Sequence, residues 1–203
     1  MSIAHLRKFI SSSNSHGQNI AFLTACFTFV WLLGPSASEL KAQELHPSET
    51  QVKAAYLYNF GKFVTGTSTP TTNSEYQICV LGKDPFGPVL DSTVAGEKIG
   101  GRAIRVVRLN SVQGMAPCNV LYISPSEAGR LASILQATQR VSVLTVSDIP
   151  RFAERGGTIG LVSHEGKIRF EVNRASAQQK QLTLSSELLK VAIRVIDQSA
   201  QVK

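Results

Sequence analysis

Blocks of apolar and polar positions alternate along the chain and predict strands and helices in turn. Short apolar runs bounded by Gly, Pro or polar residues are typical of strands. Six such runs lie at residues 76–82, 103–109, 118–124, 141–146, 158–163 and 167–173. Helices are predicted at residues 48–64, 84–90, 125–135 and 185–196, with a short one that ends at Glu154. Residues 65–74 are rich in Thr, Ser, Gly and Pro and predict a loop.

The order of these elements predicts the fold class. Strands that alternate with helices form a mostly parallel sheet with helices on both faces. Residues 118–124 are almost continuously apolar, which is typical of a strand buried on both faces. Only His164, Glu165 and Gly166 join the last two strands, and so short a connection favours an antiparallel hairpin. We therefore expect one three-layer α/β domain with an antiparallel hairpin near the C-terminus.

Residues 1–38 have the pattern of a signal peptide. Arg7 and Lys8 precede an apolar run at residues 20–33, which is shorter than the roughly 20 residues of a membrane-spanning helix. Three small residues follow at 36–38, so we expect cleavage after Ser38 and an exported mature domain of residues 39–203. An uncleaved anchor and a lipid-modified Cys26 are the two alternatives.

Composition narrows the class of protein. A chain of 203 residues, 43% hydrophobic and 17% charged, can bury a core of ordinary size. This argues against disorder and against a polytopic membrane protein. The net charge of +7 invites a nucleic-acid interpretation, but the basic residues are scattered along the chain. We therefore expect no nucleic-acid partner.

Cys79 and Cys118 are the two cysteines that remain once the leader is removed. An even pair in an exported protein predicts one disulfide, because such compartments favour oxidation. Both cysteines also lie on apolar runs that would be neighbouring strands. Two buried free thiols are the alternative.

The mature chain offers little that is typical of catalysis. Its two histidines, His46 and His164, are isolated, so no metal site is expected. Residues 82–87 resemble a phosphate-binding loop only in glycine content, and we interpret them as a turn before a short helix. Asp148 ends an apolar strand, where catalytic acids often lie, but a helix cap is the simpler interpretation. We expect neither an enzyme nor a bound cofactor.

Several segments together resemble the YfiR family of periplasmic proteins. They are VKAAYLYNFGKFV at residues 52–64, ICVLGKDPFG at 78–87, VLTVSD at 143–148, FAERGGTIGLV at 152–162, IRFEVN at 168–173 and SSELLKVA at 185–192. These motifs occur in the family's order over nearly the whole mature chain.

The resemblance implies a periplasmic regulator without catalytic activity. Members of the family bind the periplasmic domain of a YfiN-type inner-membrane diguanylate cyclase and hold it inactive, and a YfiB-type OmpA-like lipoprotein draws them away. Cyclic di-GMP output then rises. The resemblance also implies a homodimer, and Cys79 and Cys118 match one of the family's disulfides. A second cysteine pair, expected near Gly156 and Gly157, is missing, which puts redox control through that bond in doubt.

The final hairpin is the candidate partner-binding surface. Alternation along residues 168–173 sends Phe170 toward the core and leaves Arg169, Glu171 and Asn173 as an exposed polar row. Contact of Phe170 with the partner is the alternative to core packing. Aromatic residues on the first helix suggest a second interface, although such stripes are usually core: Tyr56, Tyr58, Phe60 and Phe63. A small-ligand-binding module that feeds another sensor or a transport system is the alternative function.

Overall fold

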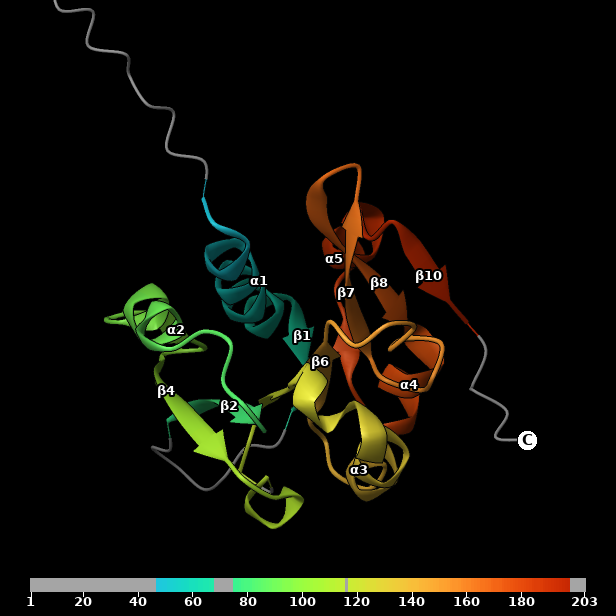
Figure 1. Cartoon of the computed structure of the whole chain (residues 1–203), viewed down its shortest axis with the longest axis horizontal. Helices are drawn as coiled ribbons and strands as arrows, with labels where there is room; N and C mark the ends of the chain where they lie inside the picture. The colour runs from blue at the N-terminus through green and yellow to red at the C-terminus, as the bar shows by residue number, and fades with distance from the viewer. Residues whose placement is uncertain (1–46, 68–74, 116, 198–203) are drawn as a thin grey trace, which may run out of the picture. The chain divides into compact units, whose positions relative to one another are not determined.

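The computed structural model describes residues 47–67, 75–115 and 117–197 (Figure 1). They fall in one compact unit of the chain, Leu45–Lys203. The predicted signal peptide lies outside the described residues, as do positions 68–74 of the predicted loop. The start of that loop is not irregular, because β1 (Val64–Thr65) pairs antiparallel with β9 (Thr183–Leu184).

An eight-stranded sheet forms the middle layer, in the order β10-β8-β7-β6-β5-β2-β4-β3. Neighbouring strands run parallel except in the two antiparallel pairs β7–β8 and β3–β4. The expected parallel sheet and C-terminal hairpin are therefore confirmed. The strands are β2 Tyr76–Leu81, β3 Lys98–Ile99, β4 Arg102–Leu109, β5 Val120–Ile123, β6 Leu144–Ser147, β7 Ile159–His164, β8 Lys167–Asn173 and β10 Arg194–Ile196.

Helices cover both faces of this sheet (Figure 1). Successive side chains of a strand point to opposite faces, so Val80 of β2 joins the core beneath α1 and α2 while Leu81 joins the core beneath α3. This is the expected three-layer arrangement. The helices are α1 Glu49–Phe63, α2 Pro88–Val94, α3 Leu131–Thr138, α4 Arg174–Gln179 and α5 Ser186–Val191, with short 3-10 turns η1 Val112–Gly114 and η2 Pro125–Arg130.

The first helix begins where the sequence predicts. The Ser48 hydroxyl accepts a hydrogen bond from the Gln51 amide at 3.3 Å, and the Gln51 side chain accepts one from the Ser48 amide at 2.7 Å. This reciprocal pair satisfies two amides that the helix itself leaves without partners. Glu49 in the first turn and Lys62 in the last turn also suit the helix dipole.

Cys79 and Cys118 form the predicted disulfide. Their Cα atoms lie 5.9 Å apart, within the usual range of about 4.4 to 6.8 Å. Cys79 is in β2, Cys118 comes two residues before β5, and these strands are paired neighbours. Both cysteines are fully buried beneath α3.

Two short predicted helices differ from the structure. The helix expected at 84–90 begins only at Pro88, because the Asp84 carboxylate accepts a hydrogen bond from the Phe86 amide and holds a turn there. The segment that ends at Glu154 forms turns and no helix. The Phe152 ring packs so closely on Gly157 that a Cβ there would lie 2.1 Å from the ring. A compact turn at residues 150–157 results.

The helix expected at 185–196 is the clearest error. α5 ends at Val191, and the chain then becomes extended and forms β10 beside β8. The Ile193 amide donates to the Phe170 carbonyl at 3.0 Å, which starts this pairing. β-branched residues from Val191 onward fit a strand better than a helix. α4 and β9 are further elements that the sequence pattern did not predict.

Candidate functional site

The β7–β8 hairpin carries the residues that the sequence singled out. Phe170 points toward α1 and is buried there, with its ring centroid 5.5 Å from that of Tyr56 and 5.0 Å from that of Phe60. The expectation of core packing for Phe170 is therefore confirmed. Tyr56 and Phe60 are themselves stacked at 5.4 Å. This part of the aromatic stripe on α1 is thus core, while Phe63 stays exposed.

The opposite face of β8 is not the uniform exposed row that alternation predicts. Arg169 is exposed, but Asn173 is only 1% exposed, so its expected place in that row is wrong. The side-chain NH2 group of Asn173 donates to the Ala153 carbonyl at 2.8 Å, and its side-chain oxygen accepts from the Ser176 backbone amide at 2.8 Å. The turn at residues 150–157 covers this end of the strand, and Asn173 caps α4.

Glu171 lies between these extremes and holds an ion pair. Its carboxylate accepts two hydrogen bonds from Arg194 of β10, each 2.9 Å long. Arg194 also contacts Glu154 of the covering turn at 2.5 Å, and hydrogen bonds to Glu171 and Glu154 raise the pKa of the guanidinium. The Glu171 side chain is only 14% exposed. Glu171 therefore fastens β10 to the sheet, a role hidden from the sequence because the region of Arg194 was predicted to be helical.

One patch of the hairpin is left uncovered on this face. Val162 pairs directly with Arg169, and His164 with Lys167, so the four side chains share one side of the sheet. His164, Lys167 and Arg169 are exposed, and Val162 is partly exposed between them. We call these four residues the hairpin face. Lys167 and Arg169 make it basic, and Glu165 at the tip lies 4.0 Å from His164.

Asp148 is not a helix cap, contrary to expectation. Its carboxylate accepts hydrogen bonds from the Lys53 ammonium at 2.6 Å and the Tyr122 hydroxyl at 2.5 Å. Burial and the adjoining carboxylate raise the pKa of Tyr122. Burial would lower the pKa of Lys53, but its hydrogen bonds to Asp148 and Glu49 outweigh that effect and raise it. The cluster thus ties α1 to β5 and to the end of β6.

A cavity of about 300 Å³ opens beside this cluster, between α1 and the β6–β8 strands. Its charged groups are engaged with one another, since Lys53 contacts both Asp148 and Glu49. The arrangement therefore stabilises the packing of α1 and holds no activated nucleophile.

The loop at residues 82–87 follows β2, which β4 and β5 flank on opposite sides. Ligands of open α/β sheets often bind at such a point. Here Arg108 occupies the loop: it donates to Asp84 at 3.0 Å, to Asp91 at 2.8 Å and to the Gly87 carbonyl at 2.9 Å. The hydrogen bond from Arg108 lowers the pKa of Asp91. The loop is thus a braced turn before α2, as the sequence analysis expected.

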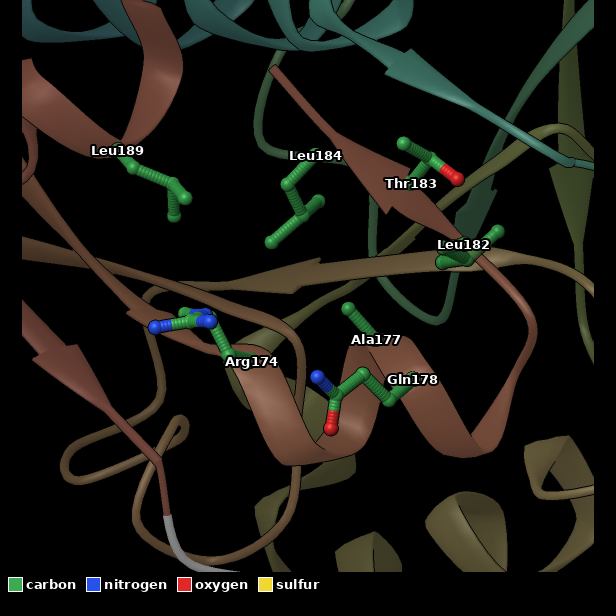
Figure 2. Close-up of a pocket in the computed structure, with 7 residues that line it drawn as sticks. All are labelled: Arg174, Ala177, Gln178, Leu182, Thr183, Leu184 and Leu189. Atoms are coloured by element: carbon green, nitrogen blue, oxygen red, sulfur yellow. The ribbon is translucent and has the colours of Figure 1, made fainter. Parts of the chain in front are cut away.

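A second cavity, of about 290 Å³, lies between α4 and the segment that contains β9 and the start of α5 (Figure 2). Leu184 and Leu189 face α4 across it, and Arg174 stands at one end. Arg174 pairs with Asp197 at 3.0 Å. The sequence analysis missed this cavity because it predicted neither α4 nor β9. It is lined by Arg174, Ala177, Gln178, Leu182, Thr183, Leu184 and Leu189.

The described residues contain neither a cluster of metal ligands nor a helix suited to span a membrane. In residues 47–67, 75–115 and 117–197, no three His, Cys, Asp or Glu side chains come together as metal ligands would. No helix in the same part of the chain has both the length and the apolar character needed to cross a bilayer.

One solved structure supports the fold. A conserved domain protein from Vibrio cholerae O1 biovar eltor str. N16961 superposes with a TM-score of 0.53 at 14% identity, covering 73% of this chain and 60% of that one. This chain therefore spans less than two thirds of that protein. The ABC domain in complex with L-Trp from Streptococcus pneumonia gives a TM-score of 0.44 at 13% identity, covering 60% and 55%. A search of curated proteins finds no significant match.

The fold and the site define an α/β domain whose polar clusters brace the structure. A family model described as YfiR/HmsC-like matches residues 50–193, well over half of the chain. The chain belongs to the YfiR/HmsC-like family. This is a regulatory family connected with diguanylate cyclase signalling, and the Cys79–Cys118 disulfide fits a periplasmic member of it.

Proposed function

We propose that this protein is a periplasmic inhibitor that binds the periplasmic domain of a YfiN-type inner-membrane diguanylate cyclase through the hairpin face. The observation that carries the proposal is the uncovered hairpin face, whose Arg169 lies within the segment at residues 168–173 that resembles the family. Arg169 is the exposed charge of that motif. A YfiB-type OmpA-like lipoprotein would draw the inhibitor away and raise cyclic di-GMP output.

An interface of ordinary size can supply the binding free energy that such an inhibitor needs. Moving a two-state cyclase from 99% active to 99% inactive requires about 5.5 kcal/mol of preference for the inactive state. An interface of standard size, roughly 800 Å² on each partner, supplies binding energy of this order. The hairpin face would form only part of such an interface, with charges that speed encounter with an acidic partner surface.

Replacement of Arg169 by Glu should weaken binding of the cyclase's periplasmic domain by about tenfold or more, because it reverses an exposed charge of the surface. Binding is measured by calorimetry with the two purified domains. Arg105→Glu on β4 is the control: this arginine is also exposed, lies away from the hairpin and, in the described part of the chain, pairs only with the exposed Glu75 at 3.3 Å, so its reversal should leave affinity unchanged. Deletion of the gene should raise cellular cyclic di-GMP, and deletion of the cyclase as well should abolish that rise.

Glu171→Lys tests this surface less well than Arg169→Glu does, although the sequence pattern alone would place Glu171 in the exposed row. The substitution would place a lysine against Arg194 and loosen β10, so a loss of binding would not separate contact from stability. If Arg169→Glu and Arg105→Glu bind alike, the hairpin face is not the interface.

Small-ligand binding is the second candidate function, and the cavity between α4 and β9 favours it. Its leucine side chains would hold an apolar body, and Arg174 at its end would hold an anionic group. This function replaces the first if deletion of the gene leaves cyclic di-GMP unchanged.

Export is part of the proposal. Because the apolar run at residues 20–33 is short and small residues follow it, the mature protein should begin near Glu39 in the periplasm. N-terminal sequencing of the periplasmic fraction measures this. An intact Met1 on a membrane-bound product, or a lipid on Cys26, would contradict it.

A further inference from the structure

The strand β4 leaves one of its two edges without a neighbouring strand over most of its length. On one side, β2 pairs with it from Ile104 to Leu109. On the other side, β3 pairs only with Arg102 and Ala103. In the described part of the chain, no strand therefore pairs with the outer side of residues 104–109, at the margin of the sheet (Figure 1).

The hydrogen bonds of β4 determine which of its backbone groups face outward. The Gly82 amide donates to the Leu109 carbonyl at 3.0 Å, so the backbone groups of Leu109 face β2. Along a strand, the backbone groups of successive residues point to opposite edges. The amides and carbonyls of Ile104, Val106 and Arg108 therefore point away from β2, and no hydrogen bond from the described residues reaches them.

The side chains along this edge are a mixture of apolar residues and one exposed arginine. Ile104 and Val106 are partly buried against the core beneath α1 and α2, and Val107 is partly buried against the core beneath α3. The Arg105 side chain is 64% exposed and lies 3.3 Å from the Glu75 carboxylate, which precedes β2. A further strand beside β4 would cover apolar side chains on both faces of the sheet.

The opposite edge of the sheet is protected. The three-residue strand β10 pairs with the end of β8, and the Ile193 amide donates to the Phe170 carbonyl at 3.0 Å. Further along β8, the Tyr56 hydroxyl donates to the Ile168 carbonyl at 3.1 Å. Very short edge strands and covering contacts keep a sheet from pairing with other chains. Within the described residues β4 has neither, so it is the edge at which another strand can be added.

We propose that the outer edge of β4 binds an extended, acidic segment of a partner polypeptide, which pairs with residues 104–108 as a further strand of the sheet. In this mode of recognition, main-chain hydrogen bonds supply affinity and alternate side chains supply specificity. The outward amides and carbonyls of Ile104, Val106 and Arg108 are the groups that make the main-chain bonds.

The charge of Arg105 selects the side chain that the partner places beside it. Glu75 contacts Arg105 from the β2 side, so a residue of the added strand lies on its open side. Opposite charges across neighbouring strands stabilise a sheet, and like charges destabilise it. The matching segment therefore has an acidic residue beside Arg105 and apolar residues beside Ile104 and Val107.

This edge is separate from the hairpin face. Three strands, β6, β5 and β2, lie between the β7–β8 hairpin and β4 in the sheet. The two surfaces can therefore hold different partners at once, and the proposal stands whether or not the cyclase binds the hairpin face. For the same reason, Arg105→Glu remains a control for binding at the hairpin face.

Two synthetic peptides of about seven residues test this edge, one that alternates valine with glutamate and one that alternates valine with lysine. In NMR titrations, the protein should bind the glutamate peptide about tenfold more tightly than the lysine peptide. Hydrogen exchange should be fast at the Ile104, Val106 and Arg108 amides of the free protein. Saturating glutamate peptide should slow it at these amides by about tenfold or more.

Arg105→Glu should reverse the preference, so that the lysine peptide binds about tenfold more tightly than the glutamate peptide. Arg169→Glu, which reverses an exposed charge on the hairpin face, is the matched control and should keep the wild-type preference. Val106→Pro removes an outward amide and no hydrogen bond to β2, so it should abolish binding of both peptides.

Circular dichroism melting shows whether each variant is folded, and the reversal by Arg105→Glu decides the question if Val106→Pro does not fold. A folded Arg105→Glu that keeps the wild-type preference would overturn the proposal. So would slow exchange at the Ile104, Val106 and Arg108 amides of the free protein, because the edge would then already be covered by its own chain or by a second copy. Protection by the peptide at other strands only would overturn it as well.

Discussion

Cys118→Ser is expected to lower the free energy of unfolding by about 4 kcal/mol, because the disulfide closes a loop of 39 residues in the unfolded chain. For a domain of this size each kcal/mol shifts the melting temperature by roughly 2 to 4 °C, so the melting temperature should fall by about 10 °C. Burial of a serine hydroxyl beneath α3 adds to the loss. Thermal and urea unfolding followed by circular dichroism measure the change.

The double variant Cys79→Ala/Cys118→Ala is the matched control for this experiment. It removes the bond without leaving a lone thiol, so it should retain most of the loss. Both cysteines are fully buried, so the native bond should also resist added dithiothreitol until the domain unfolds. Alkylation of either cysteine in denatured, unreduced protein would show that the bond is not formed.

Lys180 should make the domain more stable as the pH rises from about 8 to 10. Its side chain is buried, with the residue 5% exposed, and its ammonium donates to the Ser176 hydroxyl at 3.0 Å. Burial lowers the pKa of Lys180 to about 8, from 10.5. Between these values the folded state has released the proton while the unfolded chain still holds it, so deprotonation favours folding. The full difference corresponds to about 3 kcal/mol.

Urea unfolding at a series of pH values tests this effect, with circular dichroism as the signal because the chain's one tryptophan, Trp31, lies in the proposed leader. Lys180→Met should abolish the rise and stabilise the domain at pH 7, since it removes the buried charge and keeps most of the volume. The exposed Lys98→Met is the control and should change neither. A flat profile from pH 8 to 10 would contradict the prediction.

Tyr76, like Tyr122, should lower the stability of the domain again at high pH. Burial raises its pKa from 10.0 to about 12, so the unfolded chain loses this proton first. Stability should therefore fall again above pH 10 in both the wild type and Lys180→Met.

The sequence predicted the central sheet well because β2 and β5 are buried on both faces and read as apolar runs. The prediction was wrong after Val191. The spacing of apolar residues there is typical of a helix, but the chain pairs with β8 and forms the strand β10. Local periodicity cannot report such pairing, because the partner strand lies about 20 residues earlier in the chain.

In the candidate site too, the sequence predicted what depends on local pattern and missed what depends on contacts between distant segments. Alternation along β8 correctly separated Phe170 from Arg169, since that pattern is local. It could not show that the turn at residues 150–157 buries Asn173, or that Arg194 binds Glu171.

The single disulfide also determines what the chain needs during oxidative folding. If the leader carrying Cys26 is removed as proposed, the two remaining cysteines can pair in only one way, so an oxidant suffices and no isomerase is required to correct a wrong pairing. Because α3 covers both cysteines in the finished domain, a thiol oxidase must reach them before that helix docks. A strain that lacks its periplasmic oxidase should therefore accumulate a less stable, reduced form of this protein.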